Sequence, residues 1–553
     1  MEENRPEKKM EQWERDFKEK KNELVGKTTE LAEKGTELKD EMIGTVKSYL
    51  SGFLKVLLVG LLVLLELLFI GLAPFVLRNL TVYFYFVLEL LSIIVILSLV
   101  NDNRSPSYKL AWVSIAMLLP VAGHIMYMLW GKPGSTKKIE REIITRMKPG
   151  LKYLNQEPGI IEEFEVKYPD KGRMAHYMVN SGFPMYKNNE ISYYPMGEDV
   201  FRVIFRDLEK AERFILINFF IVAEGAIWDR IHSILKRKIE EGVEVKFLYD
   251  DFGAALRTEK YFKQNLEAEG FEVRVFNPIH RYTEKLYMNY RSHQKIMVID
   301  GNIGYTGGFN LADEYANIVE RFGVWKDNGV RVEGDAVWGL TVTFLQMWDV
   351  CSQKEYVTYE RYIPTKKFPE SKVYAHVISD GPANNPENPI ESIYHQMIHS
   401  ASKFVYITTP YLVIEDSMKN ALTEAVKSGV DVRIITPNIP DKKSVKMLTN
   451  YNYGPLLKNG VRIFEYTPGF IHAKTIINED CGIVGTINMD YRSFYLHYEN
   501  GVWMADDTII GTIKEDLLKT MEISHEVTYE EWKRRPNTWK VYQPVLNLFS
   551  TLM

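Results

Sequence analysis

The sequence predicts an α/β fold of two similar lobes, each a mixed sheet flanked by helices, with the active site between them. Amino-terminal transmembrane helices are predicted to precede the lobes in the sequence. Strand-like and helix-like segments recur in the same order in two halves, roughly 180 residues apart. A histidine followed two places later by lysine occurs once in each half, at His293 and at His472. Residues 53–130 hold three apolar runs, each about as long as a membrane-spanning helix.

The composition of the 553-residue chain is that of a folded protein, with 46% hydrophobic and 25% charged residues. A net charge of −5 counts against an overall basic nucleic-acid coat. The two cysteines, Cys351 and Cys481, exclude a disulfide framework and a four-cysteine zinc site. A mean hydropathy of −0.20 excludes a protein made mostly of membrane spans.

Residues 1–52 are predicted to form a charged, amphipathic helical tail. They carry 11 Lys/Arg and 13 Asp/Glu, and a heptad stripe of apolar residues that is only half filled. This pattern favours an exposed or surface-lying helix over an interfacial or self-association helix. The tail is too long and too acidic for a secretory signal peptide.

Residues 53–130 are predicted to be membrane segments. Residues 80–100 contain one charge, Glu89, and residues 110–129 contain none. The polar stretch 101–109, which includes Pro106, separates them, so we expect these two runs to form a transmembrane hairpin. Residues 56–77 contain one charge, Glu66, and either span the bilayer or enter it partly.

The distribution of basic residues predicts the orientation. The hairpin loop offers Arg104 and Lys109, whereas residues 132–152 offer seven Lys/Arg, which favours the cytoplasmic side for the catalytic region. The 11 basic residues of the tail also favour the inside, and three full spans cannot place both ends there. We therefore expect a multi-pass membrane protein with the region after the last span facing the cytoplasm.

The remainder of the chain is predicted to contain a first lobe at 131–370, a second lobe at 371–535 and an amphipathic segment at 536–553. Strand, helix and strand are expected at 213–222, 227–241 and 243–249, and again at 403–413, 417–427 and 430–435. Gly242 and Gly429 follow the two helices, as a carboxyl-terminal cap requires. The last segment either lies on the membrane or packs on the domain.

The two histidine motifs supply the candidate catalytic residues. Each motif continues into an apolar run and a small-residue turn that ends in asparagine. In an extended strand, residues i and i+2 share one face, so His and Lys should point together. The motif residues are His293, Lys295, Asp300, Gly308 and Asn310 in the first half, and His472, Lys474, Glu479, Thr486 and Asn488 in the second.

This set of residues suits a phosphodiester substrate. One neutral imidazole can attack phosphorus and carry the phosphoryl group covalently. A second, protonated imidazole can donate to the leaving alkoxide and later accept a proton from the incoming alcohol. Lysine and asparagine can stabilise charge on the equatorial oxygens, so this chemistry requires neither a metal nor a cofactor.

The repeated motif resembles the HxKxxxxD signature of the phospholipase D superfamily, and the chain is more narrowly similar to bacterial cardiolipin synthases over residues 85–553. Further matching stretches are 307–315 (GGFNLADEY), 325–327 (WKD), 408–411 (TTPY) and 485–494 (GTINMDYRSF) with Glu499. The resemblance implies two phospholipase D-like lobes that join two phosphatidylglycerol molecules into cardiolipin and release glycerol. It also implies His293 as nucleophile and His472 as general acid and base, an order that the sequence cannot establish.

Two positions depart from the family pattern. The family has aspartate where this chain has Glu479, and a shorter spacing leaves Asn478, Glu479 or Asp480 as candidates for the second motif acid. His497 stands where the family usually has asparagine, and a substituted pocket residue explains it more simply than a third catalyst. Glu499, with Glu320 or Asp313 as its counterpart in the first half, is a candidate for fixing a histidine tautomer.

Other functions remain as alternatives. A phospholipase D-type hydrolase, or a transphosphatidylase using another alcohol or phosphatidylethanolamine, would form the same intermediate. A nuclease is opposed by the apolar segments and the net charge, and a non-catalytic scaffold by the intact motifs. We expect phosphatidylglycerol as the partner, no nucleic acid, no cofactor and no metal, and leave a homo-oligomer open.

Overall fold

The computed structural model describes residues 60–61, 64–66, 68, 72, 80–131, 137–255, 257–278, 290–352, 356–384 and 387–552. The chain divides into two compact units, Met1–Arg78 with Ile279–Leu286, and Asn79–Pro278 with Tyr287–Met553. The predicted tail at 1–52 and most of the run at 56–77 lie outside the described residues. Everything below concerns the second unit.

The first lobe is built on a seven-stranded mixed sheet. Its strand order is β2-β10-β8-β7-β3-β4-β5. The strands are β2 (Asn189–Tyr194), β10 (Gly329–Gly334), β8 (Ile303–Gly307), β7 (Lys295–Ile299), β3 (Phe214–Phe219), β4 (Glu244–Asp250) and β5 (Glu272–Phe276). The pairs β3–β4 and β4–β5 are parallel and the others antiparallel.

The second lobe repeats this order on a larger sheet. Its order is β1-β11-β20-β18-β17-β12-β14-β15-β21, with β6 paired to β20. The strands are β1 (Met185–Tyr186), β11 (Tyr374–Asp380), β20 (His497–Ala505), β18 (Gly482–Gly485), β17 (Thr475–Ile477), β12 (Phe404–Thr408), β14 (Asp431–Pro437), β15 (Arg462–Tyr466), β21 (Ser524–Val527) and β6 (Arg291–Ser292). Taken in sheet order, the seven strands β11-β20-β18-β17-β12-β14-β15 therefore correspond one by one to β2-β10-β8-β7-β3-β4-β5 of the first lobe.

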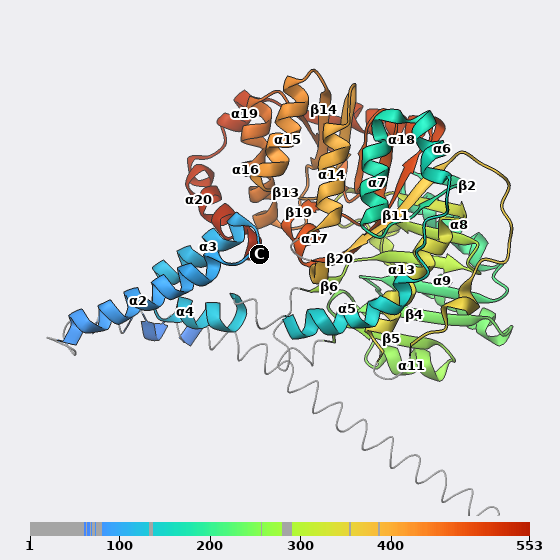
Figure 1. Ribbon diagram of the computed structural model, residues 1–553, viewed down its shortest axis with the longest axis horizontal. Helices are drawn as coiled ribbons and strands as arrows, with labels where there is room; N and C mark the ends of the chain where they lie inside the picture. Colours follow the sequence, from blue (N-terminus) through green and yellow to red (C-terminus); the bar gives the residue numbers. More distant parts are fainter. Residues whose placement is uncertain are drawn as a thin grey trace, which may run out of the picture. The chain divides into compact units, whose positions relative to one another are not determined.

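Helices cover both sheets and fill the space between them (Figure 1). Helices α8 (Gly197–Leu208), α9 (Ala226–Glu240) and α11 (Phe262–Ala268) pack on the first sheet. Helices α6 (Ile160–Lys167), α7 (Gly172–Asn180), α14 (Pro389–His399), α15 (Asp416–Lys427) and α16 (Lys443–Lys458) pack on the second. The core between the sheets contains residues of α5 (Lys137–Leu151), α13 (Val337–Val350) and α18 (Asp507–Glu522).

The predicted strand–helix–strand segments are found in both lobes with small shifts. The helices are α9 and α15, and Gly242 and Gly429 after them have φ of 91° and 94°, the left-handed conformation that glycine tolerates. The run predicted at 403–413 is divided into β12 and β13 (Leu412–Val413). The segment 160–186, predicted within the first lobe, packs on the second because α6, α7 and β1 cover its sheet.

The apolar run at 80–100 forms helix α2 (Thr81–Val100). Within it, Val82–Val100 has a mean hydropathy of 2.4 and is only 18% buried. Twenty residues of helix extend about 30 Å, the thickness of a bilayer core. By length and composition α2 is able to cross a membrane, and it is the one such helix among the residues that the structure describes.

The run predicted at 110–129 is not one continuous helix in the structure. Helix α3 (Pro106–Leu118) has 13 residues, about 20 Å, and ends before Pro120. The chain then turns back through α4 (Ala122–Met126) and η2 (Tyr127–Gly131). Trp112 and Tyr127 pack ring against ring at 5.7 Å, and a Cβ at Gly123 would lie 2.5 Å from the carbonyl oxygen of Ile115.

Both ends of this turned-back segment meet. The Arg104 guanidinium donates to the carbonyl oxygen of Gly131 at 2.6 Å, and the Tyr108 hydroxyl donates to the same oxygen at 3.3 Å. Proline at the turn removes a backbone donor, and Gly123 permits the close return of the chain. We call residues 105–131 the helical loop.

The helical loop packs on the two lobes and the carboxyl-terminal helices, residues 137–552, which we call the catalytic body. Tyr108 and Trp112 share a buried cluster with Tyr491, which begins the short helix α17 (Tyr491–Tyr495). Helix α3 also contacts α20 (Asn537–Leu548), which lies against α16 (Figure 1). The predicted carboxyl-terminal amphipathic segment thus packs on the protein, while its Val541, Tyr542 and Val545 remain exposed.

Candidate active site

The two motif histidines stand at equivalent places, where strands of the two lobes cross. His293 lies between β6 and β7, and His472 between β16 (Gly469–Ile471) and β17. Strand β6 pairs in parallel with β20 of the second lobe, and β16 pairs in parallel with β9 (Val324–Lys326) of the first. Each histidine is therefore fixed to a strand of the opposite lobe.

This exchange gives each histidine a carboxylate from the other lobe. His293 Nδ1 lies 2.9 Å from both carboxylate oxygens of Glu499, and His472 Nδ1 lies 2.7 Å from Asp327 Oδ2. Both carboxylate side chains are fully buried, and both imidazoles are 9% exposed. With the proton on Nδ1, donated to the carboxylate, Nε2 of each ring carries the lone pair required for chemistry.

The structure corrects the predicted counterpart of Glu499, which is Asp327 and neither Glu320 nor Asp313. Asp313 instead accepts the backbone N–H groups of Ala226 and Ile227 at the start of α9, and Glu320 is exposed. The missed residue had a signal in the sequence. Residues 327–329 and 499–501 are both an acid followed by Asn-Gly, at corresponding places after the two motifs.

The motif lysines are buried beside the histidines. Lys295 Nζ donates to the carbonyl oxygen of His293 at 2.8 Å, and Lys474 Nζ makes the same bond to His472. Burial lowers the pKa of Lys295 to about 7 and that of Lys474 to about 8. Lys474 also lowers the pKa of Lys295, and both ammonium groups lower the pKa of both histidines, so the four motif residues form one electrostatic cluster.

The histidines differ in their charge environment. Burial, followed by Lys295, places the pKa of His293 well below its usual value, and burial with Lys474 lowers the pKa of His472 to about 4. Burial raises the pKa of Glu499 to about 8. Burial also acts to raise the pKa of Asp327, but the positive charges of His472 and Lys474 outweigh burial, so the pKa of Asp327 is lowered. His472 thus has the more anionic partner, which favours its imidazolium form.

Gly308 and Thr486 occupy corresponding places beside the two carboxylates. A Cβ at Gly308 would lie 2.0 Å from Asp327 Oδ1 and 2.8 Å from the carbonyl oxygen of His472, so glycine permits the approach of Asp327. Thr486 occupies the corresponding place in the second lobe, and its hydroxyl donates to Glu499 Oε2. Both residues support a carboxylate, one by leaving space and the other by a hydrogen bond.

The two motif asparagines have different contacts. Asn310 Oδ1 accepts the backbone N–H of Ile221 at 3.0 Å, and its amide donates to the Tyr315 hydroxyl at 2.8 Å. The buried Oδ1 of Asn488 has no hydrogen-bond partner among the residues that the structure describes. Since an amide can be flipped, Asn488 is able to present its NH₂ group to an anionic oxygen.

Asp300 and Glu479, both predicted to be catalytic, bind backbone N–H groups at the starts of strands, and we interpret both as structural residues. Asp300 accepts three backbone N–H groups at the start of β3, those of Glu212, Arg213 and Phe214, at 2.7–3.0 Å. Glu479 accepts the N–H groups of Ser402 and Lys403 just before β12. Asn478 bonds other groups and Asp480 pairs with Lys171, so Glu479 is the structural equivalent of Asp300.

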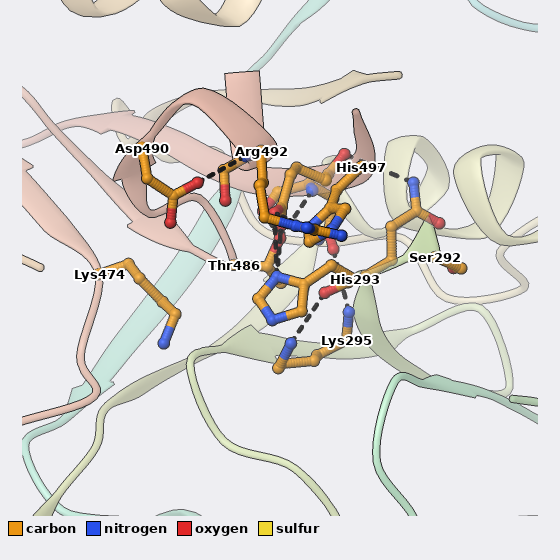
Figure 2. A network of polar contacts seen from close by, with 12 residues as sticks. Ser292, His293, Lys295, Lys474, Thr486, Asp490, Arg492 and His497 are labelled. Atoms are coloured by element: carbon orange, nitrogen blue, oxygen red, sulfur yellow. Dashed lines mark hydrogen bonds and ion pairs between the residues drawn. The ribbon is translucent and has the colours of Figure 1, made fainter. Parts of the chain in front are cut away.

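A further histidine and an arginine complete one side of the site (Figure 2). The ring of His497 lies 5.5 Å from that of His293, and Arg492 Nε lies 3.4 Å from His497 Nε2. The Phe220 ring packs against His293 at 5.2 Å, and the rings of Tyr315, Trp325 and Phe470 surround His472 at 5.3–5.9 Å. These rings restrict the access of water to both imidazoles.

This arrangement can carry out phosphoryl transfer. It holds two imidazoles, each bound at Nδ1 by a carboxylate, and two buried ammonium groups in one electrostatic cluster. Such a site can bind an anionic phosphodiester, attack its phosphorus and protonate a leaving alkoxide.

Comparisons with known proteins place the chain in a family. A family model described as "Cardiolipin synthase, PLD-like domain" matches residues 204–333 and 394–521, and one described as "Phospholipase_D-nuclease N-terminal" matches residues 90–132. The chain is 33% identical over 484 residues to the "Major cardiolipin synthase ClsA" of Bacillus subtilis, covering 85% of this chain and 98% of that one. It is 37% identical over 463 residues to an uncharacterized protein of Streptococcus mutans, covering 83% and 99%.

A third relative agrees with this placement, and a solved structure has a similar fold. The cardiolipin synthase of Oceanobacillus iheyensis is 32% identical over 464 residues, covering 82% of this chain and 95% of that one. The phosphatidylserine synthase of Haemophilus influenzae has a similar fold, with a TM-score of 0.53 at 12% identity over 69% of this chain and 100% of that one. The chain therefore belongs to the cardiolipin synthase family of phospholipase D-like proteins.

Proposed function

We propose that this protein is a cardiolipin synthase that transfers a phosphatidyl group from one phosphatidylglycerol to the hydroxyl of a second and releases glycerol. The observation that carries the proposal is the crossed pair of imidazoles, each bound at Nδ1 by a carboxylate of the opposite lobe. That arrangement supplies one nucleophile and one proton donor at a buried, positively charged site.

In the first step, His293 Nε2 attacks the phosphorus of the donor lipid, and the bond from phosphorus to the glycerol oxygen breaks. His472 Nε2–H gives its proton to the glycerol alkoxide. Lys295 and Lys474 stabilise the negative charge that grows on the equatorial oxygens. In the second step, His472 accepts the proton of the acceptor hydroxyl, the new oxygen–phosphorus bond forms and the phosphorus–nitrogen bond to His293 breaks.

The charge environment supports this order of roles. The pKa of His293 is lowered well below its usual value, so His293 stays neutral at pH 7 and is able to act as the nucleophile. The lowered pKa of Asp327 supplies a carboxylate to stabilise the imidazolium of His472. The negative charge of a bound phosphodiester raises the pKa of His472 from the low value of the empty site.

The decisive experiment uses the purified full-length protein in vesicles that contain phosphatidylglycerol. Cardiolipin and glycerol should appear in equal amounts, and His293→Ala and His472→Ala should each abolish turnover. Phosphatidic acid as the main product would instead establish a phospholipase D-type hydrolase. An assay with phosphatidylethanolamine as the added lipid tests the alternative transphosphatidylase. Activity that survives either histidine substitution would contradict the two-histidine mechanism.

We further propose that the protein is held in a bacterial cell membrane with its catalytic body on the cytoplasmic side. The apolar surface of α2 and the seven basic residues at 132–152 support this placement. The helical loop would enter the bilayer from that same side, because both of its ends adjoin the catalytic body. A second crossing at 56–77 would then make the protein multi-pass and keep the basic tail inside.

A further inference from the structure

Arg492 and His497 lie next to the nucleophile but have no part in the transfer described above. Arg492 is in α17, and His497 begins β20, two residues before Glu499. Figure 2 shows the two side chains together beside His293 and Lys295, and their nitrogens are 3.4 Å apart. Arg492 therefore contacts His497, and the ring of His497 in turn lies beside that of His293.

Positive charge dominates this side of the site. After burial, the groups that most lower the pKa of His497 are Arg492, Arg291, Lys295 and Lys442, all of them cations. The nearby carboxylates already accept other hydrogen bonds: Glu499 Oε1, 3.6 Å from His497 Nδ1, belongs to the carboxylate that binds His293 and Thr486. Asp250 accepts from Arg291 and the backbone of Ser292, and Asp490 accepts from the backbone of Ser493. A buried region with this balance of charge attracts an anion.

A metal ion is the alternative occupant, because donor atoms of His293, His497 and Glu499 lie within 4.8 Å of one another. Their nitrogen and oxygen donors are of the kind that zinc accepts. A divalent cation at that point would, however, face Lys295, Arg492 and Arg291 across a low-dielectric site. The same charges that repel a cation attract a phosphate.

We propose that Arg492, held in place by His497, binds the phosphodiester of the acceptor phosphatidylglycerol. This inference rests on the proposed synthase function. The acceptor hydroxyl must reach the phosphorus on His293, and in that lipid the hydroxyl is separated from its own phosphate by three carbons. The Arg492 guanidinium contacts His497, which lies beside His293, and is thus placed to hold that second phosphate with two parallel N–H donors.

The site would thereby select its acceptor. Water and small neutral alcohols have no phosphate, so they gain nothing from Arg492. Phosphatidylglycerol gains a charge-assisted contact that positions its hydroxyl for the second step, in which the hydroxyl proton passes to His472 and the phosphorus–nitrogen bond breaks. Arg492 touches the substrate away from the reacting atoms, and His497 is a positioning residue that acts through it.

The test is an acceptor competition with the full-length enzyme in phosphatidylglycerol vesicles and 1-propanol in the buffer. Both acceptors take the same phosphatidyl group from His293, so the ratio of cardiolipin to phosphatidylpropanol reports acceptor choice alone. Arg492→Gln should lower this ratio about tenfold or more, since a charge-assisted bidentate contact is lost. Arg492→Lys and His497→Asn should lower it less, and Arg462→Gln, a remote surface control paired with Glu526, should leave it unchanged.

Each outcome decides the proposal. An unchanged ratio in Arg492→Gln would overturn the acceptor role, as would an equal loss of both products, which would place Arg492 in the first step. Thermal unfolding verifies that each variant is folded. If Arg492→Gln does not fold, the milder Arg492→Lys provides the test. A wild-type enzyme that forms phosphatidic acid but no cardiolipin would refute the synthase function itself, and the acceptor site with it.

Discussion

At the scale of single residues, the two carboxylates that hold the histidines are not equivalent. Burial raises the pKa of Glu499 to about 8, whereas the positive charges of His472 and Lys474 keep the pKa of Asp327 low. An anionic partner matters most where an imidazolium forms, which in our assignment is His472. The two carboxylates can therefore be used to test the order of the histidines.

We expect Asp327→Asn to reduce kcat much more than Glu499→Gln does, by about tenfold to 100-fold or more. Each substitution keeps the shape of the side chain and removes its charge, so the two variants control for one another. Steady-state kinetics with phosphatidylglycerol vesicles at pH 7 measures the difference. A larger loss in Glu499→Gln would reverse the roles of His293 and His472.

The lysine pKa values predict how the activity depends on pH. In the empty site Lys295 and Lys474 are charged below about pH 7 and about pH 8 and lose their charge above these values. Because kcat/KM reports the free enzyme, it should fall as the pH rises through 7 to 8, while kcat should fall only at higher pH. The phosphodiester of the substrate keeps its charge throughout this range. A kcat/KM that is constant or rises up to about pH 9 would contradict charged lysines in binding.

The sequence predicted the residues of each histidine motif but not the partner of His472. Motif spacing along one strand places His472 and Lys474 together, because strand geometry is local. Asp327 comes from the other half of the chain, 145 residues away, and is fixed by the parallel pairing of β16 with β9. Such a contact follows from tertiary structure, and only the repeated acid–Asn–Gly triplets hinted at it.

At the scale of elements, Asp300 and Glu479 fix the starts of β3 and β12. Asp300 has φ of 56°, a left-handed conformation that asparagine tolerates and alanine does not favour. Asp300→Ala should lower the free energy of unfolding by about 1–3 kcal/mol, because three backbone N–H groups at the start of β3 lose their acceptor and alanine is strained at this φ. Asp300→Asn keeps one acceptor oxygen and should be milder.

Thermal or denaturant unfolding of the full-length protein measures the effect of these Asp300 variants. The kcat of the folded fraction should change little in both, since the carboxylate does not touch the imidazoles. Glu479→Gln is the matched variant in the second lobe and should behave as Asp300→Asn does. An Asp300→Asn enzyme that is stable but inactive would restore Asp300 to the catalytic residues.

The helical loop shows that hydropathy alone does not predict whether an apolar run forms one continuous helix. Residues 110–129 are apolar enough and long enough for a span, so composition alone predicts one. The turn at Leu119 and Pro120 depends on the contact of Gly123 with Ile115 and on the ring contact of Trp112 with Tyr127. The strands and helices of the two lobes were predicted well because alternation and glycine caps are local signals.

At the scale of the whole molecule, the two lobes cannot work apart. Each lobe carries a histidine, and each also supplies the carboxylate that the other histidine needs. The strand pairs β6–β20 and β16–β9 maintain this exchange. Duplication of one unit has therefore produced a single active site, and the helical loop adjoins it through Tyr491, the neighbour of Arg492.

The contact of the helical loop with α17 determines the expected membrane topology. A transmembrane hairpin would place residues 101–109 on the side of the membrane opposite to the catalytic body. In the structure, Ser105 instead lies beside Tyr491 and Glu415 of that body. A 13-residue helix is also too short to cross a core of about 30 Å. Residues 101–109 should therefore share the side of the catalytic body.

Cysteine labelling tests this topology. In a background with Cys351 and Cys481 replaced by alanine, Asn103→Cys and the exposed body position Lys519→Cys receive a membrane-impermeant maleimide, in intact and in permeabilised cells. Both residues are exposed, so both cysteines should react readily once reached. We expect the two to be labelled only after permeabilisation, because they lie on the cytoplasmic side together. Labelling of Asn103→Cys but not Lys519→Cys in intact cells would establish the full hairpin, and would mean that the contact of Ser105 with α17 does not form in the membrane.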